Sequence, residues 1–540
     1  MESMLALAGT CEGDLLALAA ALPLLGVGGA VASGWFAHRL PGRGRRLRAA
    51  LGCAAAAGLA AAVWLWHACG APSTGAALGA GWWGAFVTVD AHRLLAACVL
   101  TQAALLAYLS ARVDKTLPRR SFAGGIAWLW ALGLWIVWLD NGPARAWACT
   151  LWALSLPFVV VGSPVSIARA RAAFAAAGAP AGAALLWLCL EASVPGAAWP
   201  RTLCAVVWVC ALPLPGMMRL WSEGFAPGFL FAQCAGGVLA VLLAGGGGDA
   251  PWAAGLCAAA ALAAGLGACL AQQAGRFAAF ALIAFLQQGA AAAFLGDPAS
   301  ALLFMTFFPL GAFALYAVAR AGRREGGDIR ERAELRLPKW AGWCLTAALC
   351  GILGGILPGP VLAVRLRVLA ELWEGGAWGL AGTAALLGSV CCLLIGSVRW
   401  TAWRDGGPSA PVPRHVRAAL WACLAALIAP AALQLLFLRG FVPASGWFLP
   451  LAVLAPAAAL ACLVRWGTGD GVTRLWSWTS PAVEDAVYAA SGPAPAAALL
   501  RAMGAAARAA DGALRGLAVL IWALFRAAGT LARELERGRT

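Results

Sequence analysis

Leu212-Pro213-Leu214-Pro215-Gly216 interrupts an apolar stretch that runs from about residue 204 to 245. Pro213 and Pro215 lack backbone donors, so they predict a break in the middle of a would-be helix. In hydrocarbon, a broken helix is tolerated only where protein or a water-lined cavity covers it. Breaks of this kind occur where transporters handle ions or substrates. The alternative interpretation is a proline kink that only packs.

A second motif of the same kind, Leu357-Pro358-Gly359-Pro360, lies in the apolar run from Cys344 to Leu369. Both motifs are followed by a Leu-Trp pair with Glu and Gly close behind, at 220–224 and 372–375. Corresponding interrupted segments in two halves of a chain indicate a transporter core built from repeats. The predicted helix breaks are Pro213, Pro215, Pro358 and Pro360.

The composition predicts an all-α polytopic membrane protein. Of the 540 residues, 62% are hydrophobic and 11% charged, whereas soluble domains have roughly 25% charged residues. A bilayer requires about 20 apolar residues per helix, and about fifteen segments (14 to 16) meet that length. They are 14–36, 48–68, 88–112, 121–139, 145–163, 170–190, 199–218, 225–246, 251–271, 276–296, 299–320, 340–372, 377–400, 416–438 and 445–465.

The net charge of +16 comes from arginine and lysine gathered in alternate loops. The basic loops are 39–48, 115–120, 169–171, 320–339 and 399–417. By the positive-inside rule, these loops face the cytoplasm and the N-terminus faces outward, as in a protein of the bacterial inner membrane. The basic excess therefore reflects topology and contact with anionic lipids rather than nucleic-acid binding. The acidic start of the chain lacks the basic region of a cleavable signal peptide.

The cysteines and histidines do not predict a metal site, a cofactor or a disulfide framework. The seventeen cysteines are scattered through apolar segments without a CxxC motif, which is typical of small hydrophobic residues. The four histidines lie in loops or at segment ends. A haem or metal centre inside the membrane is therefore not expected.

The C-terminal segment 471–540 differs from the rest because arginines punctuate an Ala/Leu-rich helix. Its apolar core, residues 516–525, is too short to span a bilayer. We expect an amphipathic helix that lies in the interface. The alternatives are a short additional span and a clamp on a neighbouring subunit.

Few polar side chains fall inside the apolar segments. Gln233, Gln287, Gln288 and Thr306 can hold water but cannot titrate. After the second break come Arg365, Arg367 and Glu371. Arg367 and Glu371 are four residues apart and can pair on one helix face. We interpret this set as an ion path or coupling element; the alternative is an arginine that extends to the outer interface.

In one collinear register over about residues 80–405, the motifs resemble the antiporter-like subunits of respiratory complex I, Mrp-type antiporters and membrane-bound hydrogenases. The motifs that carry the resemblance are Val87-Thr88-Val89-Asp90, Trp138-Leu139-Asp140-Asn141, Ala211-Leu212-Pro213-Leu214, Gln272-Gln273, Phe304-Met305-Thr306-Phe307-Phe308 and the stretch from Leu357 to Arg367. The resemblance implies two inverted five-helix repeats, each with one broken helix. The resulting divisions are 1–120 (three helices), 121–246 (first repeat, broken at 212–216), 251–400 (second repeat, broken at 357–360), 401–470 (two helices) and 471–540.

The family implies a buried glutamate on the fifth helix and lysines near the seventh, eighth, eleventh and twelfth helices. This sequence departs from that pattern. Ala153 or a neighbour stands at the glutamate position, and Trp208, Gln233 and Gly311 fall near three of the lysines. Arg367 coincides with the twelfth-helix lysine.

These departures predict a membrane subunit of a larger ion-translocating or redox-coupled complex with a degenerate proton channel. Its role would be scaffold or coupling, at most as a non-catalytic subunit beside other membrane subunits. One alternative is the membrane partner of an energy-coupled bicarbonate-uptake pair, with a cytoplasmic metalloprotein docked on the basic loops. Another is a lipid-modifying enzyme that uses Asp90, His92 and Asp140 at the outer face.

Overall fold

A computed structural model provides the fold. It describes residues 2–39, 41–70, 73–78, 85–113, 119–160, 167–193, 198–211, 227–245, 250–270, 274–321, 336–354, 360–374, 376–400, 404–405, 412 and 416–425. The chain forms two compact units, Met1–Asp485 and Ala486–Thr540, and all described residues belong to the first. The predicted span 445–465, the C-terminal segment and three of the predicted break residues (Pro213, Pro215 and Pro358) lie outside the described residues.

Helices make up nearly all of the described chain, as predicted. They are α1 (Glu2–Arg39), α2 (Pro41–Ala68), α3 (Ala91–Val113), α4 (Arg119–Trp138), α5 (Gly142–Val160), α6 (Ile167–Ser193), α7 (Ala198–Ala211), α9 (Pro227–Ala244), α10 (Pro251–Leu270), α11 (Ala274–Phe294), α12 (Pro298–Ala321), α13 (Lys339–Gly354), α14 (Pro360–Glu374) and α15 (Gly376–Trp400). Residues Val416–Ala425 are helical as well. The strands are β1 (Thr74–Leu78), β2 (Ala85–Val89), β3 (Arg336–Leu337) and β4 (Arg404–Asp405).

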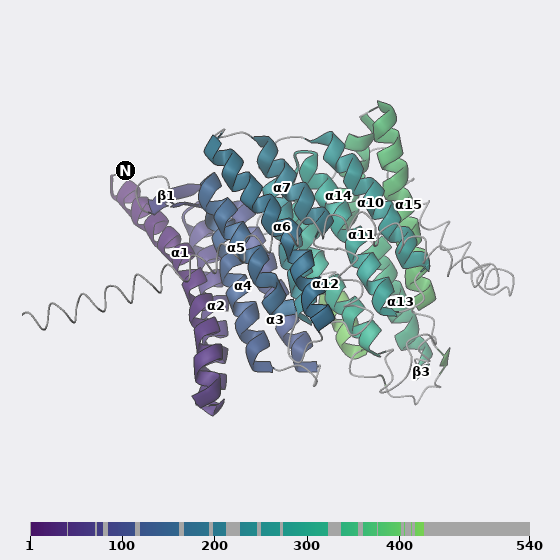
Figure 1. The fold of residues 1–540 in the computed structure, drawn as a ribbon, viewed down its shortest axis with the longest axis horizontal. Helices are drawn as coiled ribbons and strands as arrows, with labels where there is room; N and C mark the ends of the chain where they lie inside the picture. The colour runs from purple at the N-terminus through teal and green to yellow at the C-terminus, as the bar shows by residue number, and fades with distance from the viewer. Residues whose placement is uncertain are drawn as a thin grey trace, which may run out of the picture. The chain divides into compact units, whose positions relative to one another are not determined.

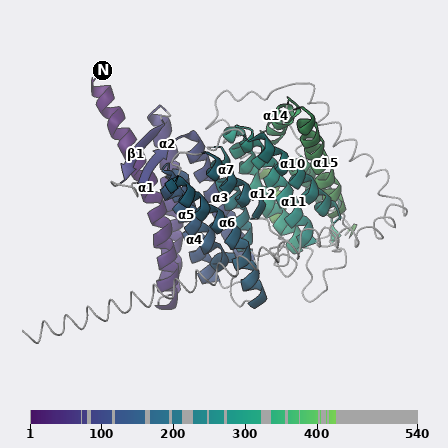
Figure 2. The ribbon, with the colours of Figure 1, turned by 45° about the horizontal axis from the view of Figure 1, so that its top comes forward.

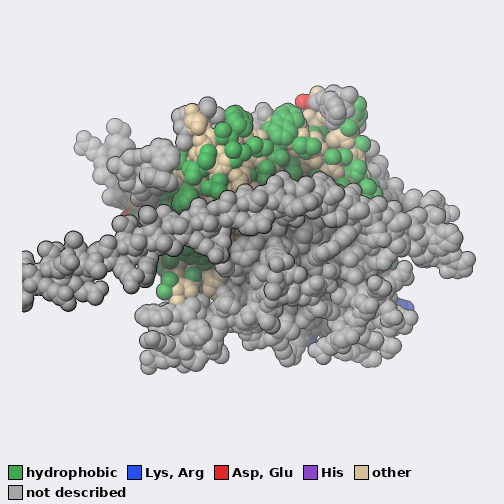
Figure 3. Space-filling view, in the orientation of Figure 1, with side chains coloured by type: hydrophobic (Ala, Val, Ile, Leu, Met, Phe, Trp, Pro, Cys, Tyr) green, Lys and Arg blue, Asp and Glu red, His purple; other side chains and the backbone are tan. Residues whose placement is uncertain are grey.

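The long helices run side by side, as Figure 1 shows. Six of the described helices are long and apolar enough to cross a membrane, and their spans lie in α1, α2, α3, α10, α12 and α15. The space-filling view in Figure 3 shows mainly hydrophobic side chains on the visible described surface. The chain is therefore a multi-pass membrane protein. The segment 340–372, predicted as one interrupted span, forms two helices, because α13 ends at Gly354 and α14 begins at Pro360.

A short β-hairpin precedes α3, which the sequence interpretation did not include. β1 pairs antiparallel with β2, where Val87, Thr88 and Val89 supply β-branched residues. The hairpin is tied to the end of α4, because the Asp140 amide donates to the Phe86 carbonyl at 2.7 Å. The segment predicted as helical from residue 88 thus becomes helical only at Ala91.

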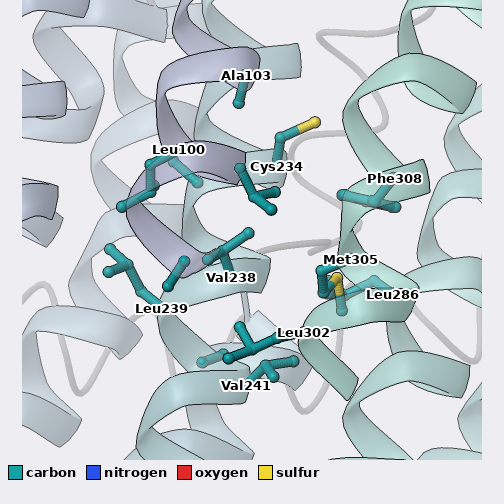
Figure 4. Packing of buried hydrophobic residues seen from close by; sticks show 14 of the residues in the cluster. Leu100, Ala103, Cys234, Val238, Leu239, Val241, Leu286, Leu302, Met305 and Phe308 are labelled. Carbon is teal, nitrogen blue, oxygen red and sulfur yellow. The ribbon is translucent and has the colours of Figure 1, made fainter. Parts of the chain in front are cut away.

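The hydrophobic core extends through the bundle, and one part of it lies between α3, α9, α11 and α12. Figure 4 shows side chains from these four helices packed together, with Leu100 on α3, Val238 on α9, Leu286 on α11 and Phe308 on α12. Gly237 lets α9 approach α11 closely, because a Cβ atom there would lie 2.5 Å from Leu286 Cδ1. Small residues at helix contacts are typical of membrane bundles, where close backbone approach gives the packing energy.

The helix contacts of α4 to α9 recur in α10 to α15. In the first group α4 contacts α5 and α9, α6 contacts α5 and α7, and α7 contacts α9. In the second group α10 contacts α11 and α15, α12 contacts α11 and α13, and α13 contacts α15. Figure 2 shows the second group, in teal and green, beside the first, and α11 contacts α7. The predicted repeat boundaries stay a prediction, which this recurrence supports.

One cysteine departs from the interpretation of the cysteines as small hydrophobic residues. Cys69, at the end of α2, is disulfide-bonded. Every other cysteine whose side chain the structure describes is free, and many are buried in helix contacts. Proximity in the fold, which spacing along the chain does not reveal, decides whether a thiol can pair.

Candidate functional site

The candidate site lies where two helices, α7 and α13, end inside the bundle. The last four carbonyls of a helix have no partner within it, and they carry partial negative charge. The structure satisfies one carbonyl near each end: Gln287 of α11 donates to the end of α7, and Arg365 of α14, which is bound by Gln288 of α11, donates to the end of α13. Both sites of contact involve glutamines that are adjacent in the sequence.

Gln287 donates a hydrogen bond to the end of α7. Its Nε2 donates to the carbonyl oxygen of Val209 at 3.0 Å, two residues before α7 ends. The Gln287 side chain is buried, and its Oε1 has no hydrogen-bond partner. An unsatisfied buried amide oxygen is unfavourable, so this position retains acceptor capacity inside the bundle.

Arg365 on α14 donates a hydrogen bond to the end of α13. Its Nη2 donates to the Leu353 carbonyl at 2.7 Å and to Gln288 Oε1 at 2.7 Å, and its Nε donates to the same Oε1 at 3.0 Å. The guanidinium carbon lies 6.0 Å from the centre of the Phe285 ring and 5.8 Å from that of Phe304. Such distances allow cation–π attraction.

Arg365 is only 4% exposed, and its Nη1 has no hydrogen-bond partner. Within the described part of the chain no carboxylate pairs with it, since both ion pairs found there belong to Arg93. Gln288 is held in turn by Ser389 on α15, whose Oγ accepts from Nε2 at 3.0 Å. A buried cation is thus balanced by neutral oxygens and aromatic rings from α11, α12 and α13.

Of the predicted site residues, the structure joins Gln288 to Arg365 by hydrogen bonds, while Gln287, the neighbour of Gln288 on α11, bonds to the end of α7. Thr306 is buried but bonds within its own helix, to the Leu303 carbonyl. Gln233 is buried with an unpaired Oε1, and no hydrogen bond joins it to Arg365 in the described structure.

The side chain of Arg367 lies outside the described residues, so its pairing with Glu371 stays a prediction. Pro360 is the first residue of α14, while the remaining predicted break residues are not described.

Sequence reasoning missed four participants: Phe285, Phe304, Ser389 and the Leu353 carbonyl. The first three look like ordinary members of apolar segments. They contribute to the site only because the charge of Arg365 is buried next to them. Their spacing along the chain does not show which rings will lie beside that charge.

A second polar cluster lies at the ends of α3, α4 and α5. Arg93 forms ion pairs with Asp90, at 3.2 Å from Nε to Oδ2, and with Asp140. Its Nη1 also donates to the Trp138 carbonyl at 2.9 Å. Asp90 caps α3, because its Oδ1 accepts from the Arg93 backbone amide. Both carboxylates that the lipid-enzyme hypothesis needs are therefore engaged in holding helix ends.

Two further arginines act on helix ends. Arg145 Nε donates to the Ile136 carbonyl at 3.0 Å, and Arg201 Nε donates to the Leu243 carbonyl at 3.1 Å. Both carbonyls belong to the last turns of their helices, where a cation is favourable. No group of three or more histidine, cysteine or acidic side chains that could hold a metal occurs among the described residues.

Comparison with known proteins places this arrangement in a fold class. No protein-family model matches the chain, and no curated protein matches it. Solved structures do. A chain of the Mrp complex from Dietzia sp. DQ12-45-1b is similar with a TM-score of 0.61 and 16% identity, over 93% of this chain and 60% of that one. The present chain thus spans less than two thirds of that relative.

Two respiratory complexes contain similar chains. One is the membrane-bound sulfane sulfur reductase, an archaeal respiratory membrane complex, with a TM-score of 0.55, 13% identity and coverage of 84% and 85%. The other is respiratory complex I from Thermus thermophilus, with a TM-score of 0.56, 18% identity and coverage of 82% and 99%. At these identities the likeness establishes the fold: the chain has the fold of the antiporter-like membrane subunits of such complexes, as predicted.

Proposed function

We propose that this protein is a membrane subunit of a multi-subunit ion-translocating or redox-coupled complex, in which it couples or supports its neighbours without conducting protons itself. The similar chains all come from multi-subunit complexes. One observation carries the proposal: the polar groups that meet between α7 and α13 are two glutamines and one arginine. None of these can exchange a proton at ordinary pH.

The remaining buried charges in the described structure support this proposal. They are Arg93, Arg145 and Asp297, and each lies at a helix end. Asp297 accepts from the Ser300 amide at the start of α12. Buried charges cost about 3 kcal/mol or more in hydrocarbon and are kept where protons or ions move. Apart from Arg365, no buried charge lies in the middle of a described helix, which favours a lost pathway.

Packing replaces titratable groups at the positions that the family resemblance singles out. Trp208 is fully buried and stacks on Trp152 with ring centres 5.3 Å apart. Its Nε1 donates to the Pro180 carbonyl at 3.0 Å. Ala153 is also fully buried, and at Gly311 a Cβ atom would lie 3.3 Å from Ile352. These positions favour helix packing over proton transfer.

Gln287 and Gln288 provide the coupling element of the proposal. Being adjacent on α11, they connect the end of α7 to Arg365 and the end of α13. A shift of either interrupted helix would strain a hydrogen bond on α11 and so reach the other. In this view the two predicted repeats, 121–246 and 251–400, are joined mechanically at their breaks.

Location and partners belong to the same proposal. We place the N-terminus outside a bacterial inner membrane, other membrane subunits beside the chain, and a cytoplasmic partner and anionic lipids on its basic loops. The disulfide of Cys69 supports this orientation, because disulfides persist on the oxidising side of that membrane.

The test begins with purification of the tagged chain from its native membranes, where co-purifying membrane subunits are expected. The purified chain alone, reconstituted in liposomes, should leave an imposed pH gradient intact, whereas the whole complex should change it when supplied with its driving reaction. A gradient collapsed by the chain alone would contradict the loss of its channel.

The coupling role is tested in the whole complex. Arg367→Ala and Glu371→Gln should lower coupled flux while assembly is kept. If both variants assemble and translocate like the unmodified complex, this pair has no special role.

A further inference from the structure

The surroundings of the Arg365 guanidinium share one property: every partner is electron-rich. Leu353 O and Gln288 Oε1 both lie 2.7 Å from Nη2. The rings of Phe285 and Phe304 lie about it at 6.0 and 5.8 Å. The four groups come from α13, α11 and α12 and converge on one point, although none of them carries a formal charge.

Neutral oxygens at the C-terminal end of an interrupted helix are the groups with which transporters coordinate a small cation. Aromatic faces add attraction for organic cations in particular. A buried guanidinium that only filled space would more commonly face a carboxylate, because an unpaired buried charge is expensive. The two oxygens and two aromatic rings around Arg365 would bind a free cation as well as one attached to a side chain.

We propose that this cluster is a binding site for a monovalent cation of the guanidinium class, occupied by the protein's own Arg365. The inference rests on the proposed function and deepens it, because a cation held in this place explains how the proton channel is closed at the second break. Arginine keeps its charge at all ordinary pH values, and its side chain tethers that charge to α14. The site is therefore filled permanently.

The first break offers an internal comparison. There the Val209 carbonyl at the end of α7 accepts from Gln287 Nε2, a neutral donor. No cation lies between those two groups, because the amide reaches the carbonyl directly. Among the described residues, oxygen and aromatic partners surround a cation at the second break alone, and the proposal is confined to it.

The experiment empties the site and offers a replacement. Arg365→Ala removes two methylene groups and the guanidinium, and ethylguanidinium supplies the same atoms as a free cation. In the purified full chain, Arg365→Ala should lower the thermal unfolding midpoint, and ethylguanidinium should restore most of the loss in a saturable manner. Ethylurea, a neutral molecule of similar shape, should not restore it.

Two variants serve as controls. Arg365→Lys keeps a tethered cation, so its midpoint should not respond to ethylguanidinium, and neither should that of the unmodified chain. Adding Gln288→Leu to Arg365→Ala removes one oxygen partner and should abolish the response. Equal effects of ethylguanidinium and ethylurea on Arg365→Ala, or equal responses in all variants, would overturn the proposal.

If Arg365→Ala does not fold alone, it is produced and solubilised with each compound, and the yield of monodisperse protein becomes the readout. Recovery with ethylguanidinium and not with ethylurea supports the site, whereas equal yields reject it. The outcome is separate from the proposed function. If ethylguanidinium rescues the variant but the unmodified chain conducts protons, the cation site stands and the proposed function is wrong. If ethylguanidinium does not rescue the variant and the unmodified chain does not conduct protons, the proposed function stands and the cation site is wrong.

Discussion

At the scale of single residues, Gln288 is the side chain on which the buried charge depends most. Its Oε1 accepts two hydrogen bonds from Arg365, so Gln288→Leu leaves the guanidinium with the Leu353 carbonyl as its only hydrogen-bond partner in the described structure. Breaking a buried charged interaction costs about 3 kcal/mol or more. We expect a loss of that order in the free energy of unfolding, measured by denaturant titration in detergent.

The neighbouring residue provides a matched control. Gln287→Leu removes the same chemical group from the same helix but breaks one neutral hydrogen bond, to the Val209 carbonyl. Such a bond contributes about 1 kcal/mol. If both variants lose the same stability, the charge of Arg365 is not what makes Gln288 important.

At the scale of elements, the contact between α14 and α15 depends on a glycine. A Cβ atom at Gly379 would collide with the backbone carbonyl of Leu372. A backbone atom cannot yield as a flexible side chain can, and overpacking of this kind costs roughly 1–3 kcal/mol. We expect Gly379→Ala to fall in the upper part of that range and to lower the thermal midpoint clearly.

Gly382, one turn further along α15, faces the same leucine. A Cβ atom there would lie 3.4 Å from Leu372 Cδ2, which is an ordinary contact distance. Gly382→Ala should therefore leave the thermal midpoint nearly unchanged. If the thermal midpoint falls equally in the two variants, then general packing between α14 and α15, and not the one backbone contact at Gly379, determines the loss of stability.

At the scale of the whole molecule, the disulfide of Cys69 predicts the orientation in the membrane. If the N-terminus faces outward, Cys69 at the end of α2 lies on the outer side. A membrane-impermeant maleimide added to intact spheroplasts should label it only after reduction by a reductant that does not cross the membrane. In the Cys69→Ser variant the disulfide partner is a free thiol, so labelling should no longer depend on the reductant. Labelling at Cys69 only after lysis would reverse the predicted topology, whereas labelling without prior reduction would contradict the disulfide.

Much of the architecture could be predicted from the sequence, because apolar length and proline position are local properties. The helices around Gly354 and Pro360 show this well, since α13 ends and α14 begins close to the predicted break. The hairpin of β1 and β2 escaped prediction, because short strands next to a capped helix give little periodic signal. The disulfide at Cys69 escaped for a different reason: it depends on distance in space.

The candidate site divides in the same way. The sequence by itself determined which polar residues the apolar segments contain, and Gln287, Gln288 and Arg365 were among them, because polar groups are rare in a chain that must enter hydrocarbon. Only the tertiary structure decided that the three meet at the ends of two interrupted helices, and that Phe285, Phe304 and Ser389 complete their surroundings. Packing of helices far apart in sequence sets those distances, and no pattern along one helix contains that information.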